Sequence, residues 1–230
     1  MRTIVIIFSS HAEWRAARKC RKVTFVQETP FGECFALLEG GRTIIFLEGG
    51  WGKISAAASV QYAILHWSPD LVINLGTCGG LQGKVERGDV ILAERTLVYD
   101  LIEQMGDQQA AYQHYTTELD LSWLPSEEHY PQPVQRGLLL SADRDILAEQ
   151  VAWLQNNFGG VAADWESGAI AWVCSKNKIK CLILRGVSDL VSPDGGEAYG
   201  NIKVFHKASE KIIANLLEHL PAWLDCVNFS

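Results

Sequence analysis

Residues 71–80 read LVINLGTCGG, a mostly apolar run that leads directly into glycines. Such a run, bounded by a turn signal, is typical of a strand buried on both faces. Similar runs occur at 4–8 (IVIIF) and 43–47 (TIIFL), and helical stretches follow at 11–21 and 54–67. Because strands alternate with helices along the chain, the sequence predicts an α/β fold.

The rest of the chain continues this alternation. We expect further strands at 89–93, 95–99, 137–141 and 181–185, and helices at 144–158, 167–176 and 205–220. Residues 23–39 predict an antiparallel meander, and the polar residues 103–133 predict a long loop. No internal repeat or linker is visible. We therefore predict a single domain, 1–230, with three αβα layers around a mixed, mainly parallel sheet.

Composition limits the classes of protein to which the chain can belong. Its 230 residues include 20 Lys and Arg against 27 Asp and Glu, a net charge of −7, and 48% are hydrophobic. These values exclude a disordered chain and argue against binding to nucleic acid or to an anionic membrane. The six cysteines form no CxxC pair, and no run approaches the ~20 apolar residues of a transmembrane helix. We expect a soluble, cytoplasmic protein with reduced thiols.

Two glycine-rich segments, at 49–53 and 76–80, follow predicted strands, and neither fits a known phosphate-binding loop. Lys53 is followed by Ile54 rather than by Ser or Thr, and the second segment does not match GxGxxG. The chain also contains no HExxH, no paired Cys or His at zinc spacing and no GxSxG. The sequence therefore predicts no metal site and no cofactor.

Acidic and small polar residues occur where predicted strands end. Glu13 follows the first strand, Thr77 follows 71–75, Glu166 follows the glycine-rich approach at 159–165, and Ser188 and Asp189 follow 182–185. Each residue alone reads as a helix cap or a surface acid. In an open α/β sheet, however, ligands bind outside the carboxyl ends of the strands, so together these residues predict a site.

Five segments in this order resemble the nucleoside phosphorylase/nucleosidase superfamily, and most closely its 5′-methylthioadenosine/S-adenosylhomocysteine nucleosidases. They are the first strand with Glu13, EGGWGK at 48–53, NLGTCGG at 74–80, DWESG at 164–168 and RGVSDL at 185–190. The resemblance spans nearly the whole chain, and the Thr-Cys pair looks like plant-type members. It implies hydrolysis of the N-glycosidic bond of a purine nucleoside, first 5′-methylthioadenosine and next S-adenosylhomocysteine. It also implies a homodimer.

The resemblance assigns the chemical roles to four side chains. Asp189 would protonate N7 of the leaving base, with Ser188 holding it, and Glu13 would activate the attacking water. Glu166 would accept hydrogen bonds from the ribose hydroxyls and favour the positive charge that develops on the sugar. To act as an acid near neutral pH, Asp189 needs a pKa raised by burial above the ~3.9 of a free aspartate.

The same resemblance supplies the remaining substrate contacts. Thr77 and Gly79 would border the ribose and the water, and Ile146 would join this pocket. Trp165 stands where the family commonly has methionine beneath the sugar, with core packing as its other reading. Trp51 replaces a smaller residue near the 5′ substituent, so its ring favours a short methylthio group.

One position argues for water rather than phosphate as the attacking group. Asn74 occupies the place where related phosphorylases carry an arginine, and a neutral amide cannot replace a guanidinium as a clamp for phosphate. Three readings stay open beside hydrolysis of 5′-methylthioadenosine. They are a futalosine-like substrate, a silent nucleoside-binding protein and a phosphorylase whose phosphate clamp is Arg15, Arg18 or Arg95.

The base-binding region departs from the family pattern. Residues 143–145 (DRD) occupy the region where the family often offers an aromatic ring to the purine. Tyr99 or the guanidinium of Arg144 could cover the base instead, or the base could differ from adenine. Arg185 is expected to pair with an acid behind the site rather than to touch substrate.

Overall fold

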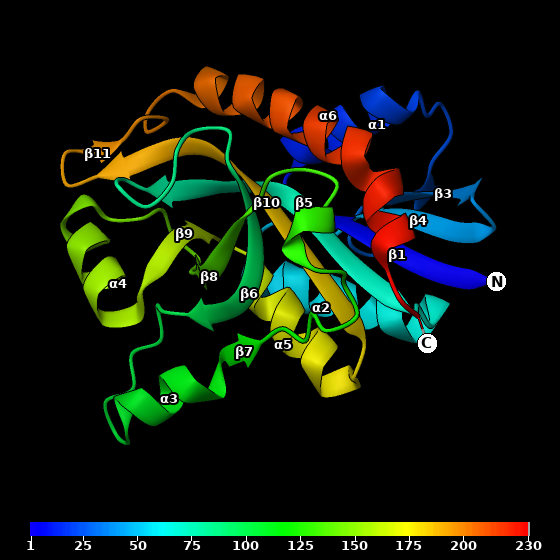
Figure 1. Ribbon diagram of the computed structural model, residues 1–230. Coiled ribbons are helices and arrows are strands. Elements are labelled where there is room, and N and C mark those ends of the chain that lie inside the picture. Colours follow the sequence, from blue (N-terminus) through cyan, green and yellow to red (C-terminus); the bar gives the residue numbers. More distant parts are fainter. Residues whose placement is uncertain (230) are drawn as a thin grey trace.

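The computed structural model describes residues 1–229, and within that range eleven strands join in one mixed sheet with helices on both faces (Figure 1). The strands are β1 (Arg2–Phe8), β2 (Gln27–Glu28), β3 (Glu33–Glu39), β4 (Arg42–Glu48), β5 (Leu71–Leu81), β6 (Val90–Val98), β7 (Thr116–Glu118), β8 (Gln135–Ser141), β9 (Gly160–Asp164), β10 (Lys180–Ser192) and β11 (Gly195–Gly196).

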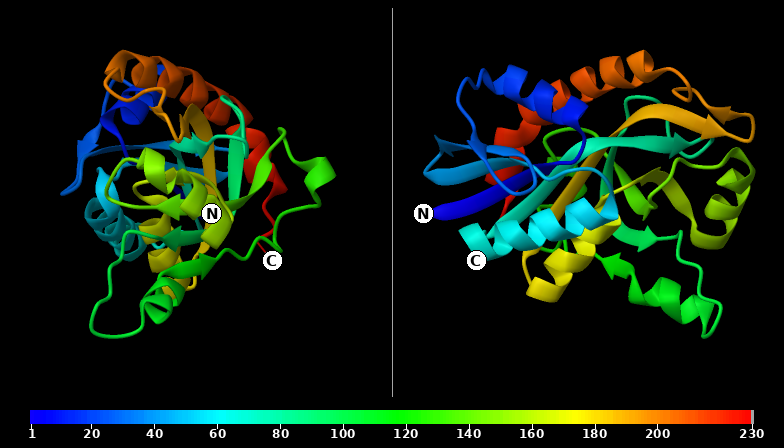
Figure 2. Two further views of the ribbon diagram at one scale, coloured as in Figure 1. Left: turned by 90° about the vertical axis from the view of Figure 1, so that its left-hand side faces the viewer. Right: turned by 180° about the vertical axis from the view of Figure 1, so that it is seen from behind.

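Helices cover the two faces of this sheet as separate layers. Helices α1 (His11–Arg21) and α6 (Ile202–Cys226) lie side by side on one face, and α2 (Gly52–Trp67) and α5 (Ser167–Asn177) lie together on the other (Figure 2). The prediction of an α/β fold with helices on both sides of a mixed sheet is therefore confirmed.

The sheet is partly closed, whereas the sequence analysis assumed an open one. Strands β4, β1, β5 and β10 pair in parallel, and so do β6, β8 and β9. Antiparallel pairing of β10 with β6 and of β5 with β9 joins these two groups. Strands β5, β10, β6, β8 and β9 thus form a ring, and residues from all of them can meet at its rim.

Two strands continue through residues that the sequence analysis placed in turns or after strands. The predicted turn at 76–80 is the second half of β5, and Ser188 and Asp189 lie within β10, beside a bulge between Val187 and Asp189. The glycines serve close packing here, since a Cβ added to Gly76 would lie 2.1 Å from Nη1 of Arg185.

Most predicted helices and strands form, with some corrections in the middle of the chain. Helix α1 has the predicted bounds, but the helix expected at 144–158 is wrong, because only η2 (Ala148–Gln150) and α4 (Val151–Phe158) are helical. The two strands expected at 89–99 are the single bulged strand β6. The expected loop at 103–133 contains α3 (Gln108–His114), β7 and η1 (Glu127–His129).

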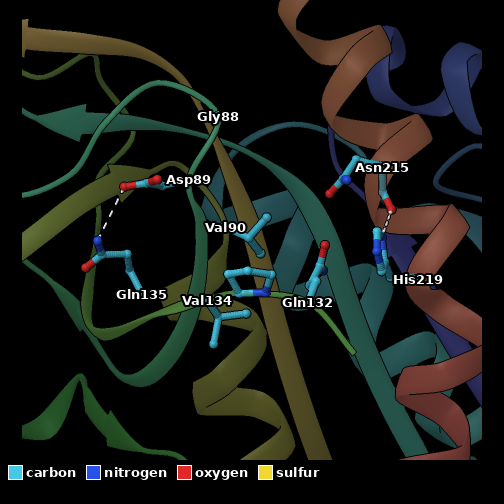
Figure 3. Close-up of a pocket in the computed structure, with 9 residues that line it drawn as sticks. Gly88, Asp89, Val90, Gln132, Val134, Gln135, Asn215 and His219 are labelled. Carbon is cyan, nitrogen blue, oxygen red and sulfur yellow. Dashed lines mark hydrogen bonds between the residues drawn. The ribbon is translucent and has the colours of Figure 1, made fainter. Parts of the chain in front are cut away.

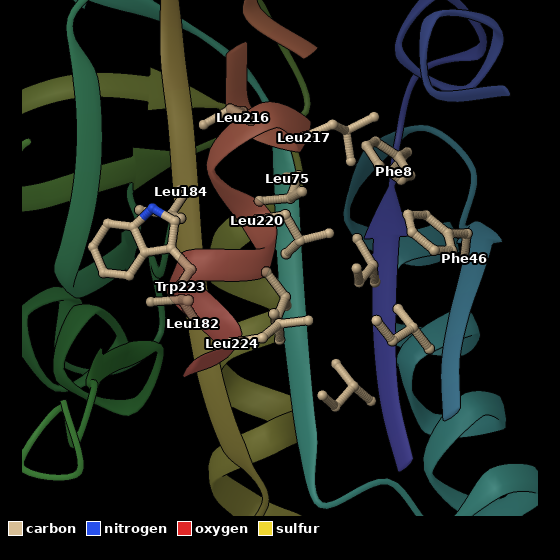
Figure 4. Packing of buried hydrophobic residues seen from close by; sticks show 14 of the residues in the cluster. Phe8, Phe46, Leu75, Leu182, Leu184, Leu216, Leu217, Leu220, Trp223 and Leu224 are labelled. Atoms are coloured by element: carbon tan, nitrogen blue, oxygen red, sulfur yellow. The ribbon is translucent and has the colours of Figure 1, made fainter. Parts of the chain in front are cut away.

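Apolar packing on the α6 face holds the long strands in place. Leucines of α6, among them Leu216 and Leu220, face Leu75 of β5 and Leu184 of β10 (Figure 4). A second cluster fills the space between the sheet and the pair α2 and α5. Among the described residues, no helix is both long enough and apolar enough to cross a bilayer.

A substitution at Gly186 tests how closely α6 packs on β10. A Cβ at this position would lie 2.3 Å from Cγ2 of Ile212, so we expect Gly186→Ala to destabilise the protein by about 1–3 kcal/mol in urea unfolding. Gly106→Ala is the matched control, because its new Cβ would lie 3.6 Å from the nearest atom of an exposed glutamate. Equal midpoints for the two variants would contradict this packing.

Candidate active site

A buried guanidinium contacts Asp164 and two of the acids that the sequence analysis singled out, Glu13 and Glu166. Arg185 of β10 is 1% exposed, and its Nε lies 2.9 Å from Asp164. Its Nη2 lies 3.4 Å from Glu166 and its Nη1 lies 3.8 Å from Glu13. The expectation that Arg185 pairs with an acid behind the site is confirmed, with three carboxylates in place of one. A buried cation of this kind compensates charges that could not otherwise leave water.

Glu13 both caps a helix and belongs to this cluster. Its Oε2 accepts hydrogen bonds from the backbone amides of Ser9 and Ser10, and the Ser10 hydroxyl accepts from the Glu13 amide, which is a capping box. Its Oε1 accepts from the amide of Thr77 at 2.7 Å and from the Thr77 hydroxyl at 2.8 Å. The carboxyl group of Glu13 therefore caps α1 and also contacts Thr77, another residue of the predicted site.

Glu166 lies at the start of α5 and is nearly as buried as Arg185. Its Oε1 accepts from the amide of Gly52 at 3.0 Å. Burial raises the pKa of Glu166 to about 8, although Arg185 and the Gly52 amide oppose this shift; the nearby Asp164 and Glu13 add to it. This raised pKa predicts that Glu166 keeps its proton at neutral pH.

Asp189 occupies the bulge of β10 and is 6% exposed. The Ser188 hydroxyl lies 2.6 Å from Asp189 Oδ1 and 3.1 Å from the carbonyl oxygen of Cys78. Burial raises the pKa of Asp189, against the lowering effect of the bond from Ser188. This environment meets the requirement that Asp189 keep a proton above the range of a free aspartate.

Strand β5 brings the two predicted catalytic acids together. The amide of Thr77 donates a hydrogen bond to Glu13. Gly79, two residues later on the same face of β5, pairs with Asp189 of β10 in the sheet. Two residues of a strand span ~7 Å, so the residues of β5 that contact Glu13 and Asp189 lie close together. Ile146 lies against this segment, with its Cδ1 3.3 Å from the position of a Cβ on Gly79.

Two tryptophans stand at the edge of the cluster. The rings of Trp51 and Trp165 stack at 4.7 Å with an interplanar angle of 21°. Trp51 is 67% exposed, and Trp165 is half-buried. Trp165 therefore packs on an exposed ring beside Glu166 rather than inside a core.

The structure uses Asn74 and the candidate phosphate-binding arginines in other contacts. The Asn74 amide donates to the carbonyl of Ile7 and accepts from Arg185 and from the Ser167 hydroxyl. Arg18 pairs with Glu33 at 2.6 Å, and Arg95 pairs with Glu118 at 3.6 Å. Asn74 therefore contacts the acid cluster through Arg185, whereas neither Arg18 nor Arg95 contacts it among the described residues.

The base-binding end contains an unforeseen contact. The hydroxyl of Tyr199 donates to the carbonyl of Ile146 at 2.7 Å, beside Asp189, and no sequence signal indicated it. Tyr99, one residue considered for covering the base, is 2% exposed, and the guanidinium of Arg144 lies 5.6 Å from its ring. Arg144 also donates to Gln150.

Sequence analysis also missed a cluster at the start of α2. Lys53 forms an ion pair with Asp100, and the amide of Lys53 donates to Asp143 at 2.8 Å. These residues stand after β4, β6 and β8, so their proximity depends on the closed strand ring. Among the described residues, no group of His, Cys, Asp and Glu is arranged to hold a metal ion.

A groove of about 330 Å³ lies elsewhere, between α6 and the starts of β6 and β8 (Figure 3). Asp89, Gln135, Asn215 and His219 are among the residues that line it, and none of the predicted site residues does. The carbonyl of Asp89 accepts from the amide of Val187, so the groove lies behind the strand that carries Asp189.

Comparison with known proteins gives a family and a fold. The family model of the phosphorylase superfamily matches residues 3–221. A 5′-methylthioadenosine/S-adenosylhomocysteine nucleosidase of Buchnera aphidicola is 27% identical over 187 residues, which cover 77% of this chain and 81% of the relative. The family model, which covers nearly the whole chain, shows the family.

Two solved Helicobacter pylori structures share this fold. A nucleosidase mutant with 5′-methylthioadenosine in its active site has a TM-score of 0.79 at 19% identity, covering 98% of this chain and 99% of that chain. A futalosine hydrolase has a TM-score of 0.81 at 19% identity, covering 97% of both chains.

The proton on Glu166 predicts how stability changes with pH. Between the ~4.3 of a free glutamate and about 8, the folded protein holds a proton that the unfolded chain releases, so this residue lowers stability as pH rises. We expect Glu166→Gln to lessen the decline in urea midpoint between pH 5 and pH 8. Glu210→Gln, at an exposed pair with Lys19, should leave the slope unchanged. Parallel curves for the wild-type protein and Glu166→Gln would contradict a protonated Glu166.

Proposed function

The chain belongs to the phosphorylase superfamily, and we propose that it hydrolyses the N-glycosidic bond of a purine nucleoside, with 5′-methylthioadenosine as the first candidate. The observation that carries this proposal is the connection of Glu13 to Asp189 through Thr77 and Gly79 of β5. Two acids that contact neighbouring residues of one strand segment suit a reaction that needs an acid at the base and a base at the water.

Asp189 would act on the leaving group. As the bond between C1′ and N9 breaks, its electron pair passes to the base, and a proton from Asp189 to N7 neutralises the charge that develops there. The raised pKa of Asp189 supports this role, because the carboxyl group must still hold its proton when the bond breaks. The Ser188 hydroxyl, 2.6 Å away, would hold the carboxyl group in place.

Glu13 would act on the water that adds to C1′. Each of its two carboxylate oxygens already accepts two hydrogen bonds, and three of the four donors are backbone amides. The Thr77 hydroxyl is the one donor that can rotate away, so we propose that the water takes its place on Oε1. The water then adds to C1′ and its proton passes to Glu13.

Glu166 would bind the sugar through its hydroxyls, and its negative charge would favour the oxocarbenium character of the transition state. The carboxylate accepts hydrogen bonds more strongly than the protonated carboxyl group, so binding of the ribose hydroxyls would favour loss of the proton from Glu166. Arg185 lies behind the carboxylate and would stabilise this charged form.

Two features support water rather than phosphate as the attacking group. The side chain of Asn74 is committed to Ile7, Ser167 and Arg185, and the carboxylate of Glu13 would repel a phosphate dianion. The stacked rings of Trp51 and Trp165 support a short apolar 5′ substituent. The Buchnera relative is named for both methylthioadenosine and S-adenosylhomocysteine, and one structural neighbour is a futalosine hydrolase, so these nucleosides complete the panel.

The acid and the base can be tested separately. We expect Asp189→Asn and Glu13→Gln each to lower kcat by about 10²–10⁴-fold, with much smaller changes in nucleoside affinity. Release of free base from 5′-methylthioadenosine, S-adenosylhomocysteine, inosine and a futalosine-type nucleoside is measured with and without phosphate. Calorimetry on the inactive variants gives the affinity.

Controls for this test are the exposed carboxylates Asp194 and Glu28, whose amide variants should keep wild-type rates. If the sugar is released as a phosphate ester and only when phosphate is present, the reaction is phosphorolysis and the proposed hydrolysis is wrong. Near-wild-type kcat in Asp189→Asn or Glu13→Gln would remove that residue from its role. Saturable nucleoside binding without any turnover would make the chain a binding protein.

We also propose that the protein works as a homodimer in the cytoplasm. Ile54, Ala58 and Leu65 form an exposed apolar stripe on α2, with Ile102 and Met105 exposed on the segment after β6. All six cysteines carry free thiols, which supports a reducing compartment. If the stripe is an interface, sedimentation should give twice the chain mass of 25.5 kDa, and Leu65→Glu should halve it. A monomeric wild-type protein would refute the dimer.

A further inference from the structure

The first turn of α2 is capped by carboxylates from distant parts of the chain. Trp51 stands at its N-cap position and makes no side-chain capping bond. The first amides instead donate outward, Gly52 to Glu166 at 3.0 Å and Lys53 to Asp143 at 2.8 Å. Free amides at a helix start are stabilised by such anions. The α2 start is thereby bound to the residue proposed to hold the ribose.

The side chain of Lys53 fastens this helix start to two loops. Its ammonium group pairs with Asp100, after β6, and lies 3.6 Å from Asp143, after β8. The amide of Asp143 also donates to Asp100 at 2.9 Å, so the three residues form one linked cluster. The Lys53 side chain is 20% exposed and that of Asp100 is 17% exposed, so water screens the pair only in part.

We propose that Lys53 is a positioning residue for recognition of the ribose, because it holds the Gly52 amide against Glu166. This inference rests on the proposed function, in which Glu166 accepts the sugar hydroxyls. Lys53 itself touches neither Glu166 nor the place of the reacting bond in the described contacts. Its effect passes through one peptide unit, from its own backbone to the amide of Gly52.

The amide of Gly52 is one of the few neighbouring groups that favour the charged form of Glu166. Glu166 faces the carboxylates of Asp164 and Glu13, which disfavour its charge, and only Arg185 and the Gly52 amide favour it. Without the ammonium of Lys53, Asp100 and Asp143 would be left as neighbouring like charges beside the α2 start. Their repulsion would move the Gly52 amide off Glu166 and loosen the Trp51 ring from Trp165.

The test compares one pair of substrates across three variants. Lys53→Met removes the charge, Lys53→Arg keeps it, and Arg42→Met is the control, since Arg42 is 23% exposed and pairs with Asp225 at 2.8 Å away from the acid cluster. The substrates are 5′-methylthioadenosine and its 2′-deoxy analogue, which lacks a hydroxyl that Glu166 would bind. The readouts are kcat/KM for each substrate from pH 6 to pH 9.

Loss of the Gly52 bond should cost about tenfold to a hundredfold in kcat/KM for the ribonucleoside, as for a hydrogen bond to a charged group. We expect a clearly smaller loss for the 2′-deoxy analogue, so the preference for ribose falls in Lys53→Met. The rise of kcat/KM with pH that accompanies ionisation of Glu166 should move to higher pH, because a donor that lowers the pKa of Glu166 is lost. Lys53→Arg should restore most of the preference, and Arg42→Met should keep it.

The outcomes separate this inference from the function on which it rests. If the wild-type protein releases no base from any nucleoside, the proposed function fails. If the wild-type protein is active and Lys53→Met loses activity equally on both substrates, or not at all, the positioning role is wrong. Should Lys53→Met fail to fold, Lys53→Gln carries the same comparison, because glutamine removes the charge and keeps a donor for Asp100.

Discussion

The site depends on one buried cation. Arg185 is the only charged group of its sign among the described contacts of Glu13, Asp164 and Glu166, and it is 1% exposed. Burial of any one of these carboxylates without a counter-charge would cost several kcal/mol. One cation cannot balance three anions, and the excess is relieved by a proton on Glu166, whose pKa is raised to about 8. In the proposed reaction, loss of this proton would give Glu166 a negative charge beside the sugar hydroxyls and the positive charge that develops on the sugar.

The strand ring makes this cluster possible. Arg185 stands on β10, Asp164 ends β9, and Asn74 and Thr77 belong to β5, so three strands around one ring supply the network. Close approach requires glycine at Gly76, where a side chain would collide with the guanidinium. Asp189 lies beside the bulge of β10, a feature that changes the direction of side chains along a strand.

Local patterns in the sequence predicted much of the fold, and they failed where distant contacts decide the structure. The apolar run at 4–8 and the helical stretch at 11–21 located β1 and α1 correctly, because their signals are local. Glycines at 76–80 read as a turn, yet they extend a strand. The segment 143–145 was considered as a base-binding region, yet the carboxylate of Asp143 caps α2, 90 residues earlier in the chain. No local pattern carries information about a partner that far away.

The residues of the candidate site also differ in whether a local sequence pattern identifies them. Glu13, Glu166 and Asp189 could be named from strand ends and from a family resemblance, because each is a chemically distinctive residue in a recognisable segment. Lys53 could not, since its meaning depends on Asp100 and Asp143, and a lysine after glycines first suggests a phosphate loop. Glu166 has both kinds of role, because the carboxyl group that the proposed chemistry needs also caps α2. A ribose that binds Glu166 must therefore share it with a helix, so substrate binding and the packing of α2 are coupled through one pair of oxygens.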